Sequence, residues 1–341
     1  MALFSRRDKN TTASDEVETA DVAPEEGTDA TAAASPAEAV PQVNISMSTF
    51  GQPAPAARPA AMPEGAQRVQ RGPAEAPART ESVPGLPDNV LVRAALTALP
   101  EQPEPIDIMM LMRQLLQGHL FVRVRGDARA QIAEGKQLTM AVSAVGDDRY
   151  LLAFTGGDAL QASVAADGDA QTSAMGQPVA AILRNVVDGP YAGFIIDHAT
   201  PGRRAVLPKA LVEKTLHDAD PAFTLKNLLA GDRTDETPAA VGAALATTRV
   251  WVAAGAVPGD EKRMGVSEVR GADGSRHLEV FSHPLEVAVL GRNDRAVPLT
   301  PEQLSKALAA DAGLTGVLVD PAGPWIMLDR EALAPVIALA G

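Results

Sequence analysis

Residues 316–324 read Gly-Val-Leu-Val-Asp-Pro-Ala-Gly-Pro, an apolar run that ends in Asp and is followed by a Pro/Gly turn. Residues 193–202 read Gly-Phe-Ile-Ile-Asp-His-Ala-Thr-Pro-Gly and repeat this order of features. A short apolar run bounded by turn residues is typical of a buried strand. Because the pattern occurs twice, with the same spacing of Gly and Asp, it predicts a fold built by repeating one unit.

The flanking segments repeat as well. Each unit has an apolar strand, a strand that ends in Phe before a helix-opening Thr or Ser, a helix, the strand that ends in Asp, and a short strand before a closing helix. The matched segments are 120–124 and 249–253, 149–154 and 276–281, 179–187 and 301–310, 191–197 and 314–320, and 206–207 and 327–328. This order predicts an α+β fold, with a small, mostly antiparallel sheet and flanking helices in each unit.

Local signals support several of these elements. Thr300-Pro-Glu-Gln303 is a capping box with Pro at the first helical position. A helix over 209–216 follows Pro208 in the same way, and Asp273-Gly274 is typical of a hairpin turn. Apolar spacing predicts further helices at 89–99 and 221–229. It does not decide which unit the helix at 89–99 packs against.

Residues 1–87 differ from the rest of the chain in composition. They hold 11 of the 27 prolines and two of the 11 aromatic residues, Phe4 and Phe50, and the first 40 positions carry nine acids against three bases. Such a segment buries too little apolar surface to offset about 1–2 kcal/mol of backbone entropy per residue. We therefore expect a disordered, Ala/Pro-rich, acidic tail whose removal leaves the thermal stability of the remainder nearly unchanged.

The predicted organisation has five parts. They are the tail and linker at 1–87, a leading helix and loop at 88–104, the first α+β unit at 105–218, a short helix and linker at 219–237, and the second α+β unit at 238–341.

Composition excludes several classes of function. The chain has no Cys, which excludes disulfides, thiolate zinc sites and a thiol nucleophile. Its formal charge of -13 argues against general nucleic-acid binding, which depends on clustered cations. We find no signal peptide and no apolar run near the ~20 residues of a membrane span. These features predict a cytoplasmic protein that binds no nucleic acid and has no transmembrane segment.

The repeated residues carry a family resemblance. An apolar strand, an Arg-x-Leu-x-x-Phe-Thr/Ser strand that leads into a helix, a Gly-x-x-x-Asp-Pro-Ala-Gly-Pro hairpin and a closing helix resemble the SseB N-terminal domain, named for enhanced serine sensitivity. The resemblance covers residues 105–341 in two copies and matches best at 316–324. It implies a bacterial cytoplasmic α+β module without transferable catalytic residues and without an established cofactor.

Motifs for specific chemistry are absent from the sequence. The chain lacks GxxxxGK[ST], GxGxxG, HExxH and GxSxG. His277 and Glu279 share one strand face, and His283 follows closely, but an ordinary polar strand face explains them better than a metal site does. We therefore assign no catalytic residue, no cofactor-binding residue and no metal ligand.

The repeat separates scaffold from chemistry. A residue that the backbone requires recurs in each copy of a unit, whereas a catalytic residue is needed once. Three pairs recur, and we interpret Phe154 and Phe281 as core aromatics, Gly193 and Gly316 as sites of close approach or strain, and Asp197 and Asp320 as turn residues that bond nearby backbone. A binding role for the two Asp stays open as an alternative.

Four other features could bear on partners. Arg125-Gly-Asp127 is interpreted as a loop after a strand. Arg203, Arg204 and Lys209 form a basic patch; a solvated face is the plainer interpretation, and contact with an acidic partner or the acidic tail is the alternative. In the tail, Val43 to Phe50 alternates like a strand that could join a sheet edge. Phosphorylation could act on threonines set among acids, Thr11, Thr12 and Thr19. An inert linker explains the strand-like stretch equally well and explains the threonines better.

Two functions remain open from the sequence. The first is a non-catalytic protein-interaction or regulatory module with a protein partner of unknown identity and an unknown oligomeric state. The alternative is a small-molecule sensor or an uncharacterised enzyme with a pocket between the two units. That pocket would be built from Tyr150, Tyr191, Trp251 or Trp325.

Overall fold

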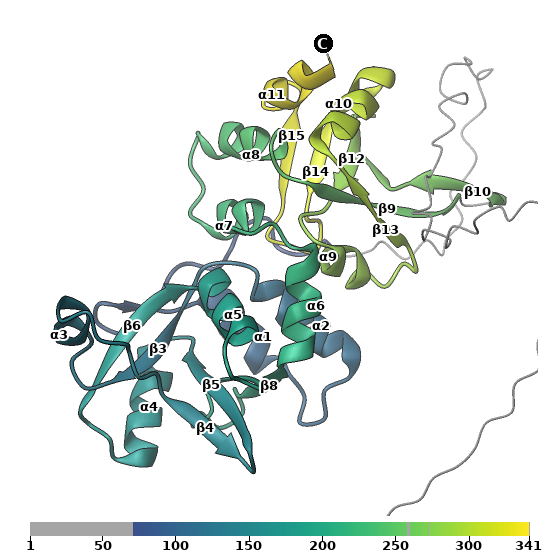
Figure 1. Ribbon diagram of the computed structural model, residues 1–341. Helices are drawn as coiled ribbons and strands as arrows, with labels where there is room; N and C mark the ends of the chain where they lie inside the picture. Colours follow the sequence, from purple (N-terminus) through teal and green to yellow (C-terminus); the bar gives the residue numbers. More distant parts are fainter. Residues whose placement is uncertain (1–70, 258–259, 272, 341) are drawn as a thin grey trace, which may run out of the picture. The chain divides into compact units, whose positions relative to one another are not determined.

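A computed structural model describes residues 71–257, 260–271 and 273–340, all of which lie within one compact unit, Met47–Gly341. The repeat appears as two modules (Figure 1). Residues 90–218 form the first module, and residues 224–340 form the second. Among the helices that the structure describes, none is long and apolar enough to cross a bilayer.

The first module contains both helices and strands. Its elements are α1 (Val90–Thr97), α2 (Pro105–Gln114), β3 (His119–Arg125), α3 (Ala128–Ala133), β4 (Val142–Val145), β5 (Asp148–Phe154), α4 (Gly157–Asp167), β6 (Thr172–Pro178), α5 (Val179–Asp188), β7 (Gly193–Ile196), β8 (Ala205–Pro208) and α6 (Lys209–Asp218). Its sheet has the order β6-β3-β5-β7-β8, with β4 paired to β5.

The second module repeats this succession, except that strand β10 stands where the first module has helix α3. Its elements are α7 (Thr224–Ala230), α8 (Thr237–Leu245), β9 (Val250–Val257), β10 (Asp260–Val266), β11 (Glu268–Arg270), β12 (Arg276–Val280), α9 (Pro284–Ala288), β13 (Arg295–Leu299), α10 (Pro301–Ala310), β14 (Leu314–Val319), β15 (Ile326–Asp329), α11 (Ala334–Ile337) and a final 3₁₀ turn (Ala338–Ala340).

The two modules share one strand topology. In the second module β9 pairs with β10 and β13, and β12 pairs with β11 and β14, which in turn pairs with β15. A single bridge between Trp251 and Phe281 joins β9 to β12. The equivalent pair in the first module is Phe121 and Phe154, where β3 meets β5. Strand pairing in each module is therefore mostly antiparallel with one parallel pair, β5 with β7 and β12 with β14, which confirms the α+β expectation.

Helices with strong local signals lie where the sequence predicts them. The helix expected at 301–310 is α10, and Thr300 and Gln303 cap it reciprocally. The helix expected at 179–187 extends one residue further, as α5. The predicted hairpin turn is present between β11 and β12, with Gly274 at a positive φ of 83°. The helices that follow Thr155 and Ser282 begin two residues later, at Gly157 and Pro284.

Several elements were not predicted. Strands β6 and β13 each pair with the first strand of their module, β3 and β9 respectively. β6 reads Thr-Ser-Ala-Met-Gly-Gln-Pro, a composition with little strand propensity. Its place in the sheet comes from pairing with β3 along seven residues, a contact between segments distant in sequence. Helix α2, at Pro105–Gln114, was also not predicted.

Each module has its own core, and the leading helices belong to those cores. Val92 and Leu96 of α1 are buried in the core of the first module, which settles the question left open for the helix at 89–99. Leu225 and Leu229 of α7 are buried in the core of the second. Leu285 of α9 packs against the first core, so the two modules share apolar contact.

Residues 71–87 correct the expected extent of the tail. They form the short hairpin β1 (Glu81–Val83) and β2 (Leu86–Pro87) and make main-chain hydrogen bonds to the rest of the described chain. Thr80 and Asp88 pair through their main chains, and Gly72 donates to the Pro321 carbonyl. Low apolar content did not prevent order here, because hydrogen bonds and close backbone packing stabilise the segment. The strand-like residues 43–50 and the three threonines lie outside the described residues.

Candidate functional site

The recurring Asp residues lie where the parallel strands of each module end. Ligands in α/β sheets bind outside the carboxyl ends of parallel strands, which makes this edge the first place to look for a site. In the first module Asp197 follows β7 directly, and Thr155 follows β5. Asp197 has a positive φ of 50°, a conformation that Asp tolerates better than most residues.

In both modules the Asp links these two strand ends. The Thr155 amide donates to Asp197 Oδ1 at 2.8 Å and its hydroxyl donates to Oδ2 at 2.5 Å. In the second module the Ser282 amide and hydroxyl donate to Asp320 at 2.8 and 2.6 Å. Asp320 has the same φ of 50°. Both Asp residues start a turn, as expected, because their main-chain carbonyls accept the Thr200 and Gly323 amides. The expectation that their side chains bond nearby backbone is wrong, because each side chain reaches a residue about 40 positions away.

Burial decides the charge of these carboxyls. Both Asp side chains are completely buried. Burial raises the pKa of Asp197 to about 6, despite the hydrogen bonds from Thr155. Burial and then the neighbouring Glu286 charge raise the pKa of Asp320 to about 6, against the opposing effect of Lys226.

Two other repeated pairs have structural roles. A Cβ on Gly193 would lie 2.2 Å from the Leu207 carbonyl oxygen, and a Cβ on Gly316 would lie 1.9 Å from the Leu328 carbonyl oxygen. The next strand therefore approaches both positions so closely that only Gly fits. Of the two explanations that the sequence allowed, close approach and strain, close approach is confirmed. Phe154 and Phe281 are completely buried, as expected of core aromatics.

A buried charge network surrounds the centre of the second module. Arg113 of α2 donates through Nε to both carboxylate oxygens of Glu286 at 3.0 Å and through Nη2 to the Gly323 carbonyl. Lys226 donates to Glu286 Oε1 at 2.6 Å, and its Nζ lies 3.9 Å from Asp320 Oδ2. Burial opposes ionisation of Glu286, but Lys226 and Arg113 outweigh it and hold its pKa below the usual range. Lys226 and the Glu286 carboxylate are thus the charged groups that act on Asp320.

The centre of the first module is covered by the segment that precedes it. Asp88 accepts hydrogen bonds from the Thr80 and Ser82 hydroxyls at 2.7 Å and pairs with Arg93 at 2.6 Å. A Cβ on Gly156 would lie 1.9 Å from Asp88 Oδ1, so Asp88 sits directly against the start of α4. Ser82 also accepts from the amide of Asp158 in the first turn of that helix. In both modules the strand ends are therefore closed by protein groups.

This duplicated arrangement agrees with a comparison to protein families. The SseB protein N-terminal domain matches residues 92–213 and again residues 224–334. The chain belongs to the SseB family. The two matches coincide with the two modules, and each contains one complete Asp–hydroxyl link. Comparisons with curated proteins and with solved structures find no match.

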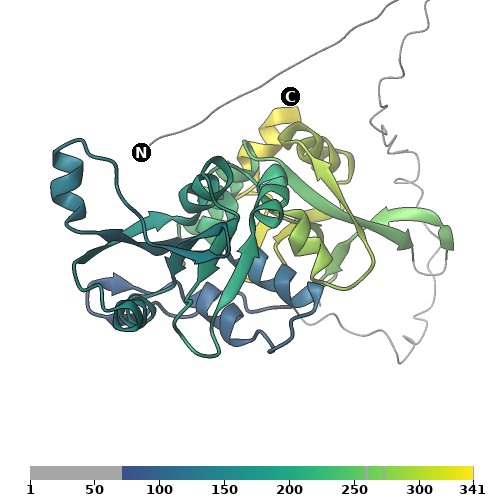
Figure 2. The same cartoon turned by 60° about the horizontal axis from the view of Figure 1, so that its bottom comes forward.

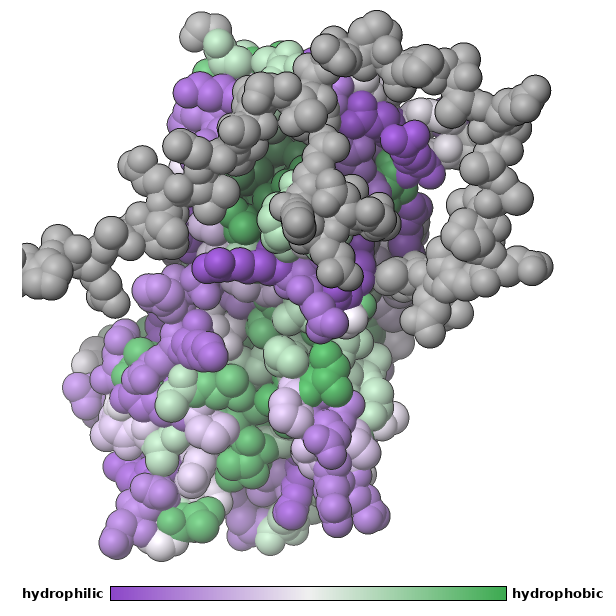
Figure 3. Space-filling model, turned by 90° about the vertical axis from the view of Figure 1, so that its right-hand side faces the viewer, coloured by the Kyte–Doolittle hydropathy of each residue, from purple (hydrophilic) through white to green (hydrophobic). Residues whose placement is uncertain are grey.

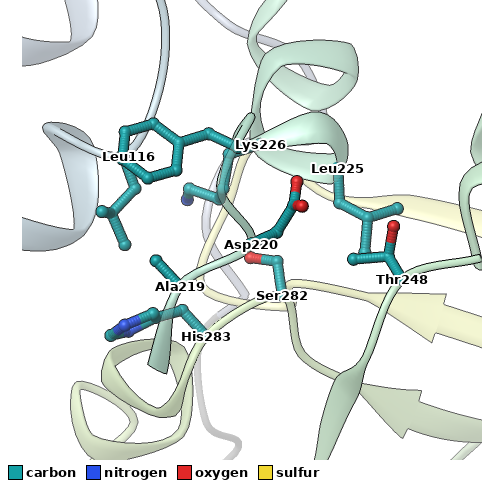
Figure 4. Close-up of a pocket in the computed structure, with 9 residues that line it drawn as sticks. Leu116, Ala219, Asp220, Leu225, Lys226, Thr248, Ser282 and His283 are labelled. Carbon is teal, nitrogen blue, oxygen red and sulfur yellow. The ribbon is translucent and has the colours of Figure 1, made fainter. Parts of the chain in front are cut away.

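A small pocket lies beside the buried network (Figure 4). It is lined by Leu116, Ala219, Asp220, Phe223, Leu225, Lys226, Thr248, Ser282 and His283. Its cavity volume is about 10 Å³, enough for about one water molecule.

The polar groups of this pocket are not arranged for nucleophilic catalysis. In a catalytic triad the His accepts the proton of the nucleophile. His283 instead places Nε2 3.0 Å from the Thr215 carbonyl oxygen and accepts the Leu285 amide at Nδ1. Burial lowers the pKa of His283, which favours its neutral form. The Ser282 hydroxyl has Asp320, and no imidazole, as its hydrogen-bond partner.

A larger pocket of the SseB-family chain is lined by residues of both modules and of the segment that precedes them. Its volume is about 190 Å³, and its lining residues are Pro77, Arg79, Pro87, Asp88, Asn89, Val90, Leu91, Gln117, Gly118, His119, Asn227, Ala230 and Gly231. None of the four aromatic residues expected to line an inter-unit pocket lines either pocket. Trp251, for example, is buried with Phe281, and Tyr191 packs on the first core.

Other residues singled out from the sequence have local partners. Glu279 pairs with Arg292 at 2.7 Å, and the part of the chain that the structure describes contains no group of three potential metal ligands. Asp127 caps α3 by accepting the Arg129 and Ala130 amides, so the Arg-Gly-Asp stretch is a strand-to-helix turn. In the basic patch Arg203 pairs with Asp158 at 3.0 Å, whereas Arg204 is exposed.

Sequence reasoning missed the network of Arg113, Lys226 and Glu286. The available signal was a lone cation inside an apolar helix, Arg113 within 106–116 and Lys226 within 224–230. Such a charge must be exposed or paired. The sequence cannot name the partner, because Arg113 and Glu286 are separated by 173 positions.

Proposed function

We propose that this SseB-family protein is a non-catalytic protein-interaction or regulatory module of the bacterial cytoplasm. The observation that carries the proposal is the duplicated Asp–hydroxyl link. Each link joins the ends of two neighbouring strands and is closed to solvent. A carboxyl and a hydroxyl used in this way in both modules support a scaffold role rather than a reactive one.

The surface offers a second repeated feature. Val206 on β8 and Met327 on β15 occupy equivalent positions opposite Ile195 and Leu318, and their exposed fractions are 53% and 37%. β8 and β15 are each the last strand of their sheet. Because these residues recur without being buried, packing does not explain them. Figure 3 shows that apolar side chains gather among hydrophilic ones on one face of the molecule as well.

Crosslinked affinity capture from native cells tests the proposal. We expect the Val206→Asp and Met327→Asp variants, singly and together, to lose proteins that the original chain captures. The matched control is Val145→Asp, at an apolar residue that is 62% exposed on β4. An unchanged set of captured proteins in the double variant would contradict the interaction role of these strands.

The alternative is a small-molecule sensor, and the 190 Å³ pocket favours it. Polar residues such as Arg79 and Asn227 are among its lining residues, and its volume suits a small polar metabolite. A thermal-shift screen of amino acids, nucleotides and metal ions tests it. A ligand that raises the Tm of the original chain but not that of an Asn227→Leu variant would favour the sensor over the interaction module.

A further inference from the structure

Residues 72–74 lie along the turn that links β14 to β15, residues 320–325. Gly72 donates its amide to the Pro321 carbonyl at 3.0 Å, and Trp325 donates its amide to the Ala74 carbonyl at 3.1 Å. The Trp325 indole Nε1–H donates to the Gly72 carbonyl at 2.9 Å. Pro73 has no amide hydrogen to satisfy. The segment is thus held through its main chain along its length.

Two arginines complete the contact. Arg233 donates through Nη2 to the Ala74 and Trp325 carbonyls, both at 3.2 Å. It therefore bridges the segment to the turn. The guanidinium of Arg71 lies 5.9 Å from the centroid of the Trp325 ring, within the range of a cation–π contact.

The contact also selects residue types. A Cβ on Gly72 would lie 2.0 Å from the Ala322 carbonyl oxygen, so only Gly fits there. On the facing side, a Cβ on Gly323 would lie 2.6 Å from the Pro73 carbonyl oxygen. Main-chain hydrogen bonds that supply affinity, together with positions that demand particular residues, are the features of peptide-recognition sites.

We propose that the turn 320–325 and Arg233 form a recognition groove for an extended Arg-Gly-Pro-Ala segment, which the chain's own residues 71–74 occupy. An external peptide with this sequence binds the same groove when residues 71–74 do not fill it. A tethered occupant has an effective concentration of the order of millimolar, so occupancy within the chain needs only weak intrinsic affinity. This inference goes beyond the proposed function and does not depend on it.

The groove belongs to the second module. Where Trp325 precedes β15, Arg204 precedes the equivalent strand β8. Arg204 is exposed and supplies no indole donor, and its neighbour Arg203 pairs with Asp158. The Asp–hydroxyl link is therefore present in both modules, whereas the recognition groove is a property of one.

Nuclear magnetic resonance of the full-length chain tests the proposal, because the chain has only two Trp residues and hence two indole N–H signals. We expect Gly72→Val to move the Trp325 indole signal, which a Trp325→Phe variant identifies. The signal of Trp251, buried beside Phe281, should stay in place and report that the second module is folded. The matched control is Ala78→Val, at an exposed residue in the same segment.

A synthetic peptide of residues 69–77 then distinguishes recognition from local disruption. Added at millimolar concentration to the Gly72→Val chain, it should return the Trp325 signal toward its original position, whereas a peptide with Val in place of Gly should not. It should leave the original chain unchanged, because that groove is filled. An unmoved Trp325 signal in Gly72→Val, no response of that variant to the peptide, or an equal response of both chains would each overturn the proposal.

Discussion

At positions 193 and 316, the carbonyl oxygens of the neighbouring strands leave no room for any residue except Gly. A Cβ at either position would come within 2.2 Å of backbone that cannot move without breaking strand pairing. We therefore expect Gly193→Ala and Gly316→Ala each to lower the free energy of unfolding by about 1–3 kcal/mol, the usual cost of overpacking. Chemical denaturation measures this.

The control for these variants is Gly176→Ala on β6. Its Cβ would lie 3.4 Å from Phe121, an ordinary contact, and the residue is exposed. Its effect should be much smaller. Equal effects at Gly176 and Gly193 would show that strand glycines are replaceable without regard to the neighbouring carbonyl.

The raised pKa of Asp197 predicts how its contribution to stability changes with pH. Because burial raises its pKa from 3.8 to about 6, the folded chain keeps a proton that the unfolded chain has lost between these values. Its contribution to stability is therefore full below about pH 4 and is lost as pH rises to about 6. Relative to Asp197→Asn, the original chain should lose up to about 3 kcal/mol across this range.

The opposite change of stability with pH is expected when the original chain is compared with the Asp158→Asn variant. Burial opposes ionisation of Asp158, but Arg203 and Arg93 hold its pKa below the usual range. The original chain should therefore gain stability over this variant as pH rises through the acid range below about 4. Denaturation curves at several pH values measure both differences, and slopes of the same sign would contradict the assignments.

At the scale of elements, α2 and α9 are joined by Arg113 and Glu286. Removing one partner of a buried pair leaves an uncompensated charge, at a cost of about 3–5 kcal/mol. Glu286→Ala should lower the free energy of unfolding by this amount, because it leaves both Arg113 and Lys226 without their carboxylate partner. Glu134→Ala, which breaks the exposed pair with Lys136, should have no measurable effect. Similar losses in the two variants would contradict a role for burial.

Elements differ in how far the sequence could predict them. The bounds of α10 follow from its own Thr300, Pro301 and Gln303, so they are readable without knowing the fold. The strands β6 and β13 depend on pairing with β3 and β9, which local composition does not encode. The repeat identified the Asp, Gly and Phe positions of the site, but the partners of Arg113 and Lys226 come from elements remote in the chain.

At the scale of the whole molecule, the segment 71–88 contacts both modules (Figure 2). Gly72 and Ala74 bind the turn of the second module, and Ser82 and Asp88 close the strand ends of the first. Val83 also packs closely enough on Gly157 that a Cβ there would lie 2.4 Å away. The sequence assigned this segment to a dispensable tail, because composition reports apolar content and not main-chain pairing.

The two SseB domains and the segment 71–88 therefore form one folded unit, and thermal unfolding of two truncated chains tests this most directly. We predict that removal of residues 1–70 leaves the Tm unchanged. Removal of residues 1–87 should lower the Tm, because the hydrogen bonds of Gly72, Ala74, Thr80 and Ser82 disappear. Each kcal/mol lost from the free energy of unfolding should lower the Tm by about 2–4 °C. The same Tm in both truncated chains would contradict this account.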